Sequence, residues 1–175
     1  MAEPQDEWLM LLDPSWQQST DDANPPPEAV LGGWRLTPSG GPTLFQGNPG
    51  YQPATPDSPT DPADATLQLV ARGEADGEQL LVVLRDCLLG VAVDAEGVAV
   101  VVPAPDDVPS VLVTTAPAHR RSVPVPDWLE VTLPELAESL PAEGIDVLLN
   151  PGAPCSMRLM TKVIKLFLAE DSAEN

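Results

Sequence analysis

Apolar residues in the first sixty positions occur in two short runs, separated by polar stretches rich in proline. The run Trp8–Leu12 is closed by Asp13-Pro14, and the run at residues 29–36 contains two adjacent glycines. Short apolar runs with such boundaries are typical of strands, and glycine inside a strand indicates an irregularity. We therefore expect two short strands here, followed by an extended surface crossing over residues 52–61.

Helical signals begin at residue 60. Asp61-Pro62 is typical of a helix start, because aspartate caps free N–H groups and proline fits the first turn; this helix should stop at Gly73. Residues 78–86 fit a helix or a strand, and we predict a helix. A capping box at residues 132–135 predicts a helix through Leu140. Apolar positions at helical spacing predict a last amphipathic helix over residues 160–169.

Between these helices the pattern changes to alternation, which predicts strands. A strand from residue 89 to 93 and runs at residues 98–102 and 110–115 are separated by turns, so we expect a three-stranded meander. Its central strand, residues 98–102, has no polar position and should be buried on both faces. Further short strands are expected at residues 129–131 and 146–149.

These elements predict an α+β fold, with a mixed, largely antiparallel sheet and flanking helices in one compact domain. The 175 residues are 43% hydrophobic, enough for one core. Residues 1–64 hold 12 of the 22 prolines and 10 acidic residues against one basic residue. We divide the chain into an acidic, proline-rich N-terminal segment with short strands packed on the core (1–63), the core (64–169) and a disordered tail (170–175).

The net charge is −19, from 27 acidic and 8 basic side chains. Such a surface repels nucleic acid and anionic lipid, so we expect neither as a partner. The apolar run near the N-terminus is too short to span a bilayer and is preceded by acidic residues, which predicts neither membrane insertion nor a secretory leader. Two cysteines are too few for a disulfide framework. We expect a cytoplasmic protein with reduced thiols.

One stretch suggests chemistry, because Cys155 follows the corner Asn150-Pro151-Gly152 at the end of a predicted strand. A cysteine nucleophile needs a base, and His119 is the one histidine. The alternative is that Cys155 is an apolar residue at the rim of the core and His119 a surface residue. We favour this second interpretation, because neither residue lies in a recognised catalytic motif.

The corner itself is interpreted as a structural turn. A phosphate cradle depends on backbone N–H groups, and Pro151 and Pro154 each lack one. Cys87, Cys155 and His119 do not have the spacing of a metal site. We predict no catalytic, cofactor-binding or metal-binding residues, and no cofactor.

A set of short motifs covers nearly the whole chain: Glu7-Trp8-Leu9, Asp13-Pro14-Ser15-Trp16, Gly32-Gly33-Trp34, Asn48-Pro49-Gly50-Tyr51-Gln52-Pro53, Pro59-Thr60-Asp61-Pro62, and Asp146-Val147-Leu148-Leu149-Asn150-Pro151-Gly152 continuing through Ser156-Met157-Arg158-Leu159. In this combination the sequence resembles actinobacterial type VII secretion system-associated proteins with an SseB-like domain. The resemblance implies a cytoplasmic α/β accessory protein without a catalytic residue set, and Cys155 departs from the small residue expected there. The Trp-x-Gly turn of secreted substrates is absent, and the fourth residue after Tyr51 is Thr55 rather than an acid, which favours a helper over cargo.

We therefore expect a non-enzymatic protein-binding accessory: an adaptor, a chaperone-like helper or an immunity-type factor. Its partner would be a secretion component or effector, bound through Trp34, Tyr51 and Arg158. Two alternatives stay open, a cysteine-dependent hydrolase using Cys155 and His119, and a small-ligand sensor with a concave polar pocket. The sequence leaves the oligomeric state undetermined.

Overall fold

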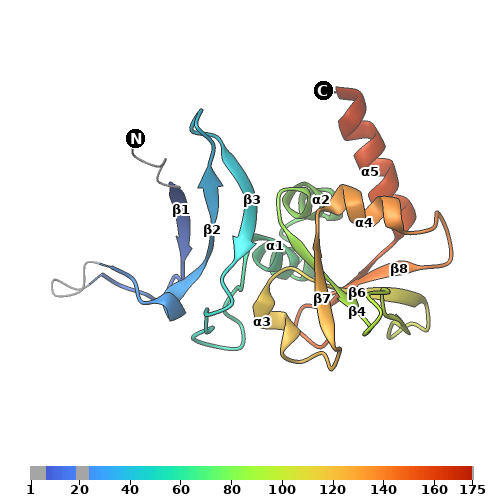
Figure 1. Ribbon diagram of the computed structural model, residues 1–175, viewed down its shortest axis with the longest axis horizontal. Coiled ribbons are helices and arrows are strands. Elements are labelled where there is room, and N and C mark those ends of the chain that lie inside the picture. Colours follow the sequence, from blue (N-terminus) through green and yellow to red (C-terminus); the bar gives the residue numbers. More distant parts are fainter. Residues whose placement is uncertain (1–6, 19–23, 175) are drawn as a thin grey trace.

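The computed structural model describes residues 7–18 and 24–174 and has an α+β fold with mixed, largely antiparallel sheets, as predicted (Figure 1). The strands are β1 (Trp8–Leu12), β2 (Val30–Leu36), β3 (Pro42–Gly47), β4 (Leu89–Val93), β5 (Val101–Pro103), β6 (Pro109–Thr114), β7 (Asp127–Val131), β8 (Asp146–Leu149) and β9 (Met157–Leu159). The helices are α1 (Pro62–Ala71), α2 (Gly77–Arg85), α3 (Pro117–Arg120), α4 (Leu133–Ser139) and α5 (Thr161–Glu174), and a 3-10 turn, η1 (Pro27–Ala29), precedes β2.

Strands β1, β2 and β3 form an antiparallel sheet in that order, which we call the small sheet. The glycine irregularity predicted in β2 is a close approach at Gly32, where φ is +155°. A Cβ at Gly32 would lie 2.2 Å from the carbonyl oxygen of Gln46 and 2.7 Å from Cζ of Phe45. Strand β3 was not predicted, because its few apolar residues lie between glycine, proline and asparagine.

The second sheet, the core sheet, has six strands in the order β7-β4-β6-β8-β9, with β5 paired to β6. Strands β6 and β8 are parallel, and the other pairs are antiparallel. Alternate residues divide between its two faces: Val111 and Val113 join the main cluster under helices α1, α2, α4 and α5, whereas Leu112 joins a smaller cluster on the other face. Both faces are therefore covered, as a sheet containing a parallel pair requires.

The prediction that residues 98–102 form a central strand buried on both faces is wrong. Strand β5 is three residues long, and Val98 and Val101 are 60% and 45% exposed. Val100 and Val102 pack on the smaller cluster. The central strand is β6, because β4, β5 and β8 all pair with it, and all of its residues except Pro109 are buried. The all-apolar run at residues 98–102 therefore has one face covered by the smaller cluster and the other face exposed to solvent.

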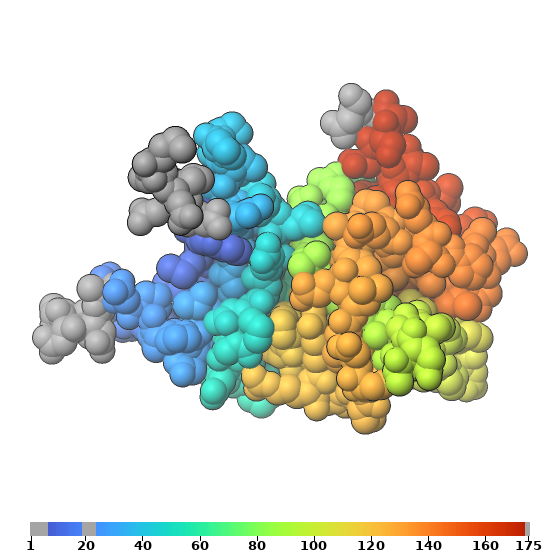
Figure 2. Space-filling model, viewed as in Figure 1, coloured from blue at the N-terminus to red at the C-terminus, as the bar shows by residue number. Residues whose placement is uncertain are grey.

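The predicted disordered tail at 170–175 is corrected for residues 170–174, since α5 continues to Glu174; Asn175 lies outside the described residues. Arg85 of α2 donates a 2.5 Å hydrogen bond to Asp171, and Ser172 Oγ donates to the carbonyl of Leu168. These contacts extend the helix four residues beyond Glu170, and α5 rises from the body of the protein in Figure 2.

Helices α1 and α4 begin where their capping residues predicted, α2 begins one residue before the predicted range, and α3 was not predicted. Asp61 caps α1, and capping boxes open α2 at Asp76 and α4 at Thr132. Each cap supplies an acceptor for N–H groups that the first turn leaves free.

The two sheets meet through β3. Phe45 accepts a backbone hydrogen bond from Leu88 and donates one to Asp86, and its ring is 1% exposed in the main cluster. In Figures 1 and 2 the small sheet lies against one side of the core sheet, with β1 farthest from it. The loop from β3 to α1 then crosses this junction and brings residues 53–60 next to α3 and to the loop after β8.

Candidate functional site

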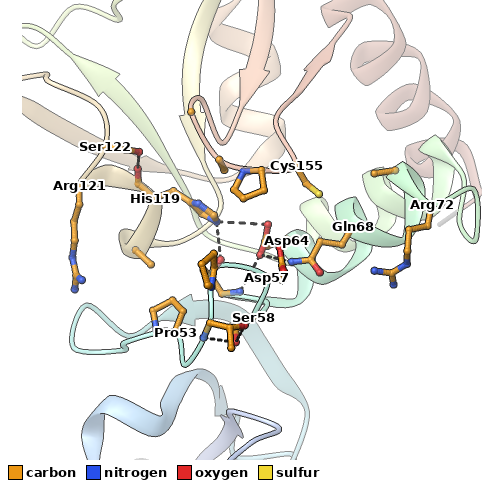
Figure 3. Close-up of a pocket in the computed structure, with 18 residues that line it drawn as sticks. Pro53, Asp57, Ser58, Asp64, Gln68, Arg72, His119, Arg121, Ser122 and Cys155 are labelled. Carbon is orange, nitrogen blue, oxygen red and sulfur yellow. Dashed lines mark hydrogen bonds and ion pairs between the residues drawn. The ribbon is translucent and has the colours of Figure 1, made fainter.

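A cavity of about 440 Å³ lies where these segments meet (Figure 3). Its walls are the loop of residues 53–60, helices α1 and α3, and the loop that follows β8. Asp64 and Gln68 reach it from α1, His119 from α3, and Cys155 from the loop after β8. The volume is within the range of small-ligand pockets, and polar side chains converge on it.

Asp61, next to this cavity, is fully buried and has all of its hydrogen-bond partners within the protein. Its Oδ1 accepts from the backbone N–H groups of Ala63 and Asp64, which is the helix cap. Its Oδ2 accepts from the hydroxyls of Thr60 and Thr115, both at 2.7 Å. A buried carboxylate needs this complete set of donors to remain stable inside the protein.

The Asn150-Pro151-Gly152 corner is joined to the same network. Asn150 is fully buried with φ +48°, a conformation that asparagine tolerates better than most residues. Its Oδ1 accepts the backbone N–H of Thr115 at 2.9 Å, and its Nδ2 donates to the Thr115 hydroxyl at 3.0 Å. The corner turns the chain after β8 and connects that strand to β6 and, through Thr115, to Asp61.

His119 faces Thr60 and Asp64. The Thr60 hydroxyl donates its proton to Asp61, so it accepts a hydrogen bond from Nε2–H of His119, 2.7 Å away. Oδ1 of Asp64 lies 3.8 Å from the same nitrogen. The His119 side chain is only 11% exposed. The expectation of a surface histidine is therefore wrong, because α3 turns this side chain inward.

The Asp64 carboxyl has an environment that disfavours its charge. Burial is the largest cause that raises its pKa, and the nearby charge of Asp61 raises it further, whereas His119 acts in the opposite direction. Oδ2 of Asp64 accepts from the backbone N–H of Thr60 and from Gln68. A buried carboxyl with a raised pKa that lines a cavity is a candidate for contact with a polar ligand.

Cys155 lines the same cavity but is not the partner of His119. No hydrogen bond joins these two described residues, and Nε2 of His119 is directed to Thr60 and Asp64. Figure 3 shows the Asp64 carboxylate between the imidazole and the Cys155 sulfur in this view. The structure therefore brings the two predicted candidates to one cavity without forming a nucleophile–base pair. Cys87 lies in the main cluster, and burial raises the pKa of its thiol far above its usual range.

Two of the predicted binding residues have internal roles. Tyr51 is 1% exposed, and its hydroxyl donates a 2.6 Å hydrogen bond to Asp13. Burial, followed by that bond, raises the pKa of Tyr51. Trp34 packs against the main cluster and meets Phe45 edge-on, with ring centroids 4.9 Å apart. Tyr51 is therefore no exposed anchor, and Trp34 presents most of its ring to the interior.

Arg158, the third predicted binding residue, forms ion pairs with Asp106 and Asp146 and is 27% exposed. It also borders a groove of about 390 Å³ between α2 and α5, which we call the α2–α5 groove. Met160, which directly precedes α5, and Val163 and Leu166 of α5 line this groove and are 52%, 41% and 55% exposed. Periodicity predicted an amphipathic helix over residues 160–169. It did not indicate that Met160 and Val163 would be exposed, because the pattern does not separate two apolar faces of one helix.

Within residues 7–18 and 24–174, no cluster of three histidine, cysteine or acidic side chains could hold a metal ion. No helix in this part of the chain is long and apolar enough to cross a membrane. The residues that sequence analysis missed are Asp64 and Thr115. In the sequence, Asp64 is a carboxylate at a helix start and Thr115 is a threonine at a strand end. Neither position indicates that Asp64 lies beside His119 or that Thr115 bonds to Asp61.

No protein-family model matches the chain, and neither does any curated protein or solved structure. The resemblance to type VII secretion system-associated proteins therefore stays a prediction that depends on the short sequence motifs that carry it. The geometry favours binding at two places, the α2–α5 groove and the cavity beside His119.

Proposed function

We propose that the protein is a non-enzymatic, protein-binding accessory and that its principal binding surface is the α2–α5 groove. The observation that supports this is the second apolar face of α5. Met160, directly before α5, and Val163 and Leu166 of α5 follow one another at three-residue spacing and expose about half of their surface. They line the groove together with Leu81 and Phe167. Contiguous apolar patches of this kind are typical of interaction sites.

The shape and chemistry of the groove suit an amphipathic helix of a partner. Its centre is apolar, and its rim carries Arg158, Glu78 and Glu170. An apolar centre with a polar rim is the usual arrangement of a protein interface, and helix-in-groove binding uses anchors at such spacing. Under the resemblance to secretion-associated proteins, the partner is a type VII secretion component or effector, and the protein acts in the cytoplasm as an adaptor, chaperone-like helper or immunity-type factor.

Site-specific photo-crosslinking tests this proposal in an actinobacterial strain that expresses the secretion apparatus. A crosslinker at Val163 should give one major adduct with a secretion component or effector. Leu166→Asp should abolish the adduct, because it places a charge in the apolar centre. Ala169→Asp is the matched control, since it adds the same charge to an exposed position of the same helix outside the groove. Equal adduct yields from the two variants would contradict the proposal.

The cavity beside His119 favours a second candidate, binding of a small polar ligand. It has a volume of about 440 Å³, and Asp64, Gln68 and His119 converge on it, so it is the kind of concave polar pocket that a small-ligand sensor needs. A panel of amines, amino acids and nucleosides can be tested by thermal shift. A stabilising ligand that loses its effect in His119→Gln, and keeps it in Leu166→Asp, would support this candidate.

The third alternative, a hydrolase that uses Cys155 and His119, has a direct test. Rapid labelling of Cys155 by a thiol probe at neutral pH, together with an activity that Cys155→Ser abolishes, would establish it. We expect slow labelling, because His119 is directed to Thr60 and Asp64 instead of the sulfur.

A further inference from the structure

Strand β1 forms one edge of the small sheet. Among the described strands, β1 pairs only with β2. The backbone N–H of Leu36 donates to the carbonyl of Glu7, and these residues are directly opposite in the register that pairs Trp8 with Arg35. Because hydrogen-bonded and non-hydrogen-bonded pairs alternate in an antiparallel ladder, the N–H and C=O groups of Trp8 and Met10 point away from β2. They form a template for another strand.

The side chains along this edge are apolar and exposed. Trp8, Leu9 and Met10 are 42%, 55% and 56% exposed, and no charged residue or proline interrupts the strand. Natural proteins usually protect open edges with lysine, proline or a covering segment, since a bare apolar edge recruits other strands. The exposure of three consecutive large side chains therefore indicates an edge that is covered by a partner.

The outer face of the small sheet adds a place for a side chain of that partner. A shallow cradle of about 240 Å³ lies there, with Trp8 and Met10 on its wall and Gly33 on its floor. A Cβ at Gly33 would lie 2.6 Å from the carbonyl oxygen of Leu9, so only glycine keeps this floor open and the strands close. The cradle has room for one apolar side chain.

Charge indicates which partner fits. The whole chain has a net charge of −19, and seven of its eight lysine and arginine residues lie between Arg72 and Lys165, outside the small sheet. Two copies paired at β1 would bring two strongly acidic proteins together, which electrostatic repulsion disfavours. A strand with basic flanks would be attracted to the same edge.

We propose that β1 binds an extended, basic segment of another protein by strand addition, with one apolar side chain of that segment in the cradle. This surface lies at the opposite side of the molecule from α5 (Figure 1), and the proposal does not depend on the α2–α5 groove. Main-chain hydrogen bonds would supply the affinity, and the cradle and the flanking charges would supply the selectivity.

The test uses the full chain and a display library of peptides of about twelve residues. Selection should enrich peptides that alternate apolar and polar residues and carry lysine or arginine at their ends. Met10→Pro removes an outward N–H without removing a β1–β2 hydrogen bond, whereas Met10→Ala shortens the same side chain and keeps the N–H. We expect Met10→Pro to raise the Kd of an enriched peptide about tenfold or more, and Met10→Ala to raise it less than about threefold.

A second measurement leaves the protein unchanged. N-methylation of alternate peptide amides should abolish binding for one set of positions and preserve it for the other, because only one set faces β1. Equal effects of the two sets would overturn the proposal, as would enrichment of no peptide or of acidic peptides. A dimer that Met10→Pro dissociates would assign the edge to a second copy, and peptide binding that only Leu166→Asp removes would assign the peptide to the α2–α5 groove. Either result also overturns it.

Discussion

The two sheets of this protein differ in how completely they are covered. The core sheet has apolar clusters on both faces, and its central strand β6 pairs with neighbours on either side. The small sheet packs one face on the core through Phe45 and Trp34 and leaves the other face and the β1 edge exposed. The core sheet is thus covered on both faces by other parts of the chain, whereas the small sheet depends on a few junction contacts and presents surface for binding.

The two Asn-Pro-Gly turns show the same difference at the level of single residues. Asn150 is fully buried and its side chain bonds to Thr115, which links two core strands and the Asp61 network. Asn48 is half-buried; it donates to the carbonyls of Pro27 and Val30 and accepts from Gly50 in its own turn. The two identical tripeptides therefore stabilise the fold to different extents, because a buried hydrogen bond costs more free energy to lose than an exposed one.

The largest effect should come from separating the sheets. Phe45→Ala removes the buried ring at their junction, and we expect a loss of about 3–5 kcal/mol in the free energy of unfolding, measured by urea denaturation. Hydrogen exchange in β1 and β2 should increase more than in β6. Leu44→Ala, on the same strand but directed to the other face, is the control and should cost clearly less. Unchanged exchange in β1 would show that the small sheet does not depend on Phe45.

The turns should rank next. Asn150→Ala leaves the buried N–H of Thr115 without its acceptor and places alanine at φ +48°, so we expect a loss of about 2–4 kcal/mol. Asn48→Ala should cost about 1–2 kcal/mol, because its partners are nearer to solvent. Asn150→Gly relieves the backbone strain alone and should recover only part of the loss. Equal costs in the two turns would contradict the argument from burial.

Asp64 and Asp13 should affect the pH dependence of stability in opposite directions, because their pKa values are shifted in opposite directions. The raised pKa of Asp64 means that its contribution to stability is fully present below the ordinary value of 3.8 and is lost as pH rises through the folded value. Hydrogen bonds from Ser15 and then Tyr51 lower the pKa of Asp13, whose contribution is present above 3.8 and is lost as pH falls through the folded value.

Two matched variants test these signs by urea denaturation at several pH values. The stability change caused by Asp64→Asn should become more favourable as pH rises from about 4 to about 7, and the change caused by Asp13→Asn should become less favourable over the range from about 3 to about 7. Parallel pH profiles for the two variants would contradict the assignment.

The smallest effect should be at the open edge. Met10→Ala is expected to change the free energy of unfolding by about 0.5 kcal/mol or less, because the side chain is 56% exposed. The same substitution at Leu84, which is 1% exposed in the main cluster, should cost about 2–5 kcal/mol. A large cost at Met10 would show that this residue supports the fold and would weaken its assignment to a binding surface.

Local signals predicted most of the elements. Strand β1, the capped helices α1 and α4, and strands β4 and β8 lie where apolar period and capping residues indicated them. These features depend on contacts between residues close in sequence. The prediction of a buried central strand at residues 98–102 was wrong. An apolar run indicates that a segment favours burial, but it does not indicate which neighbours will cover it. Helix α5 extends further than predicted for a related reason, since Arg85 holds its last turns from another helix.

The candidate site shows where local information ends. The sequence by itself determined the α+β class, the caps at Asp61 and Thr132, and the sharp turn at Asn150-Pro151-Gly152, because each follows from short-range sterics and hydrogen bonding. Only the tertiary structure decided that His119 faces Asp64 instead of Cys155, that Tyr51 is buried, and that β1 and α5 expose apolar faces. Those outcomes depend on the packing of segments far apart in the chain, which no periodicity within either segment encodes.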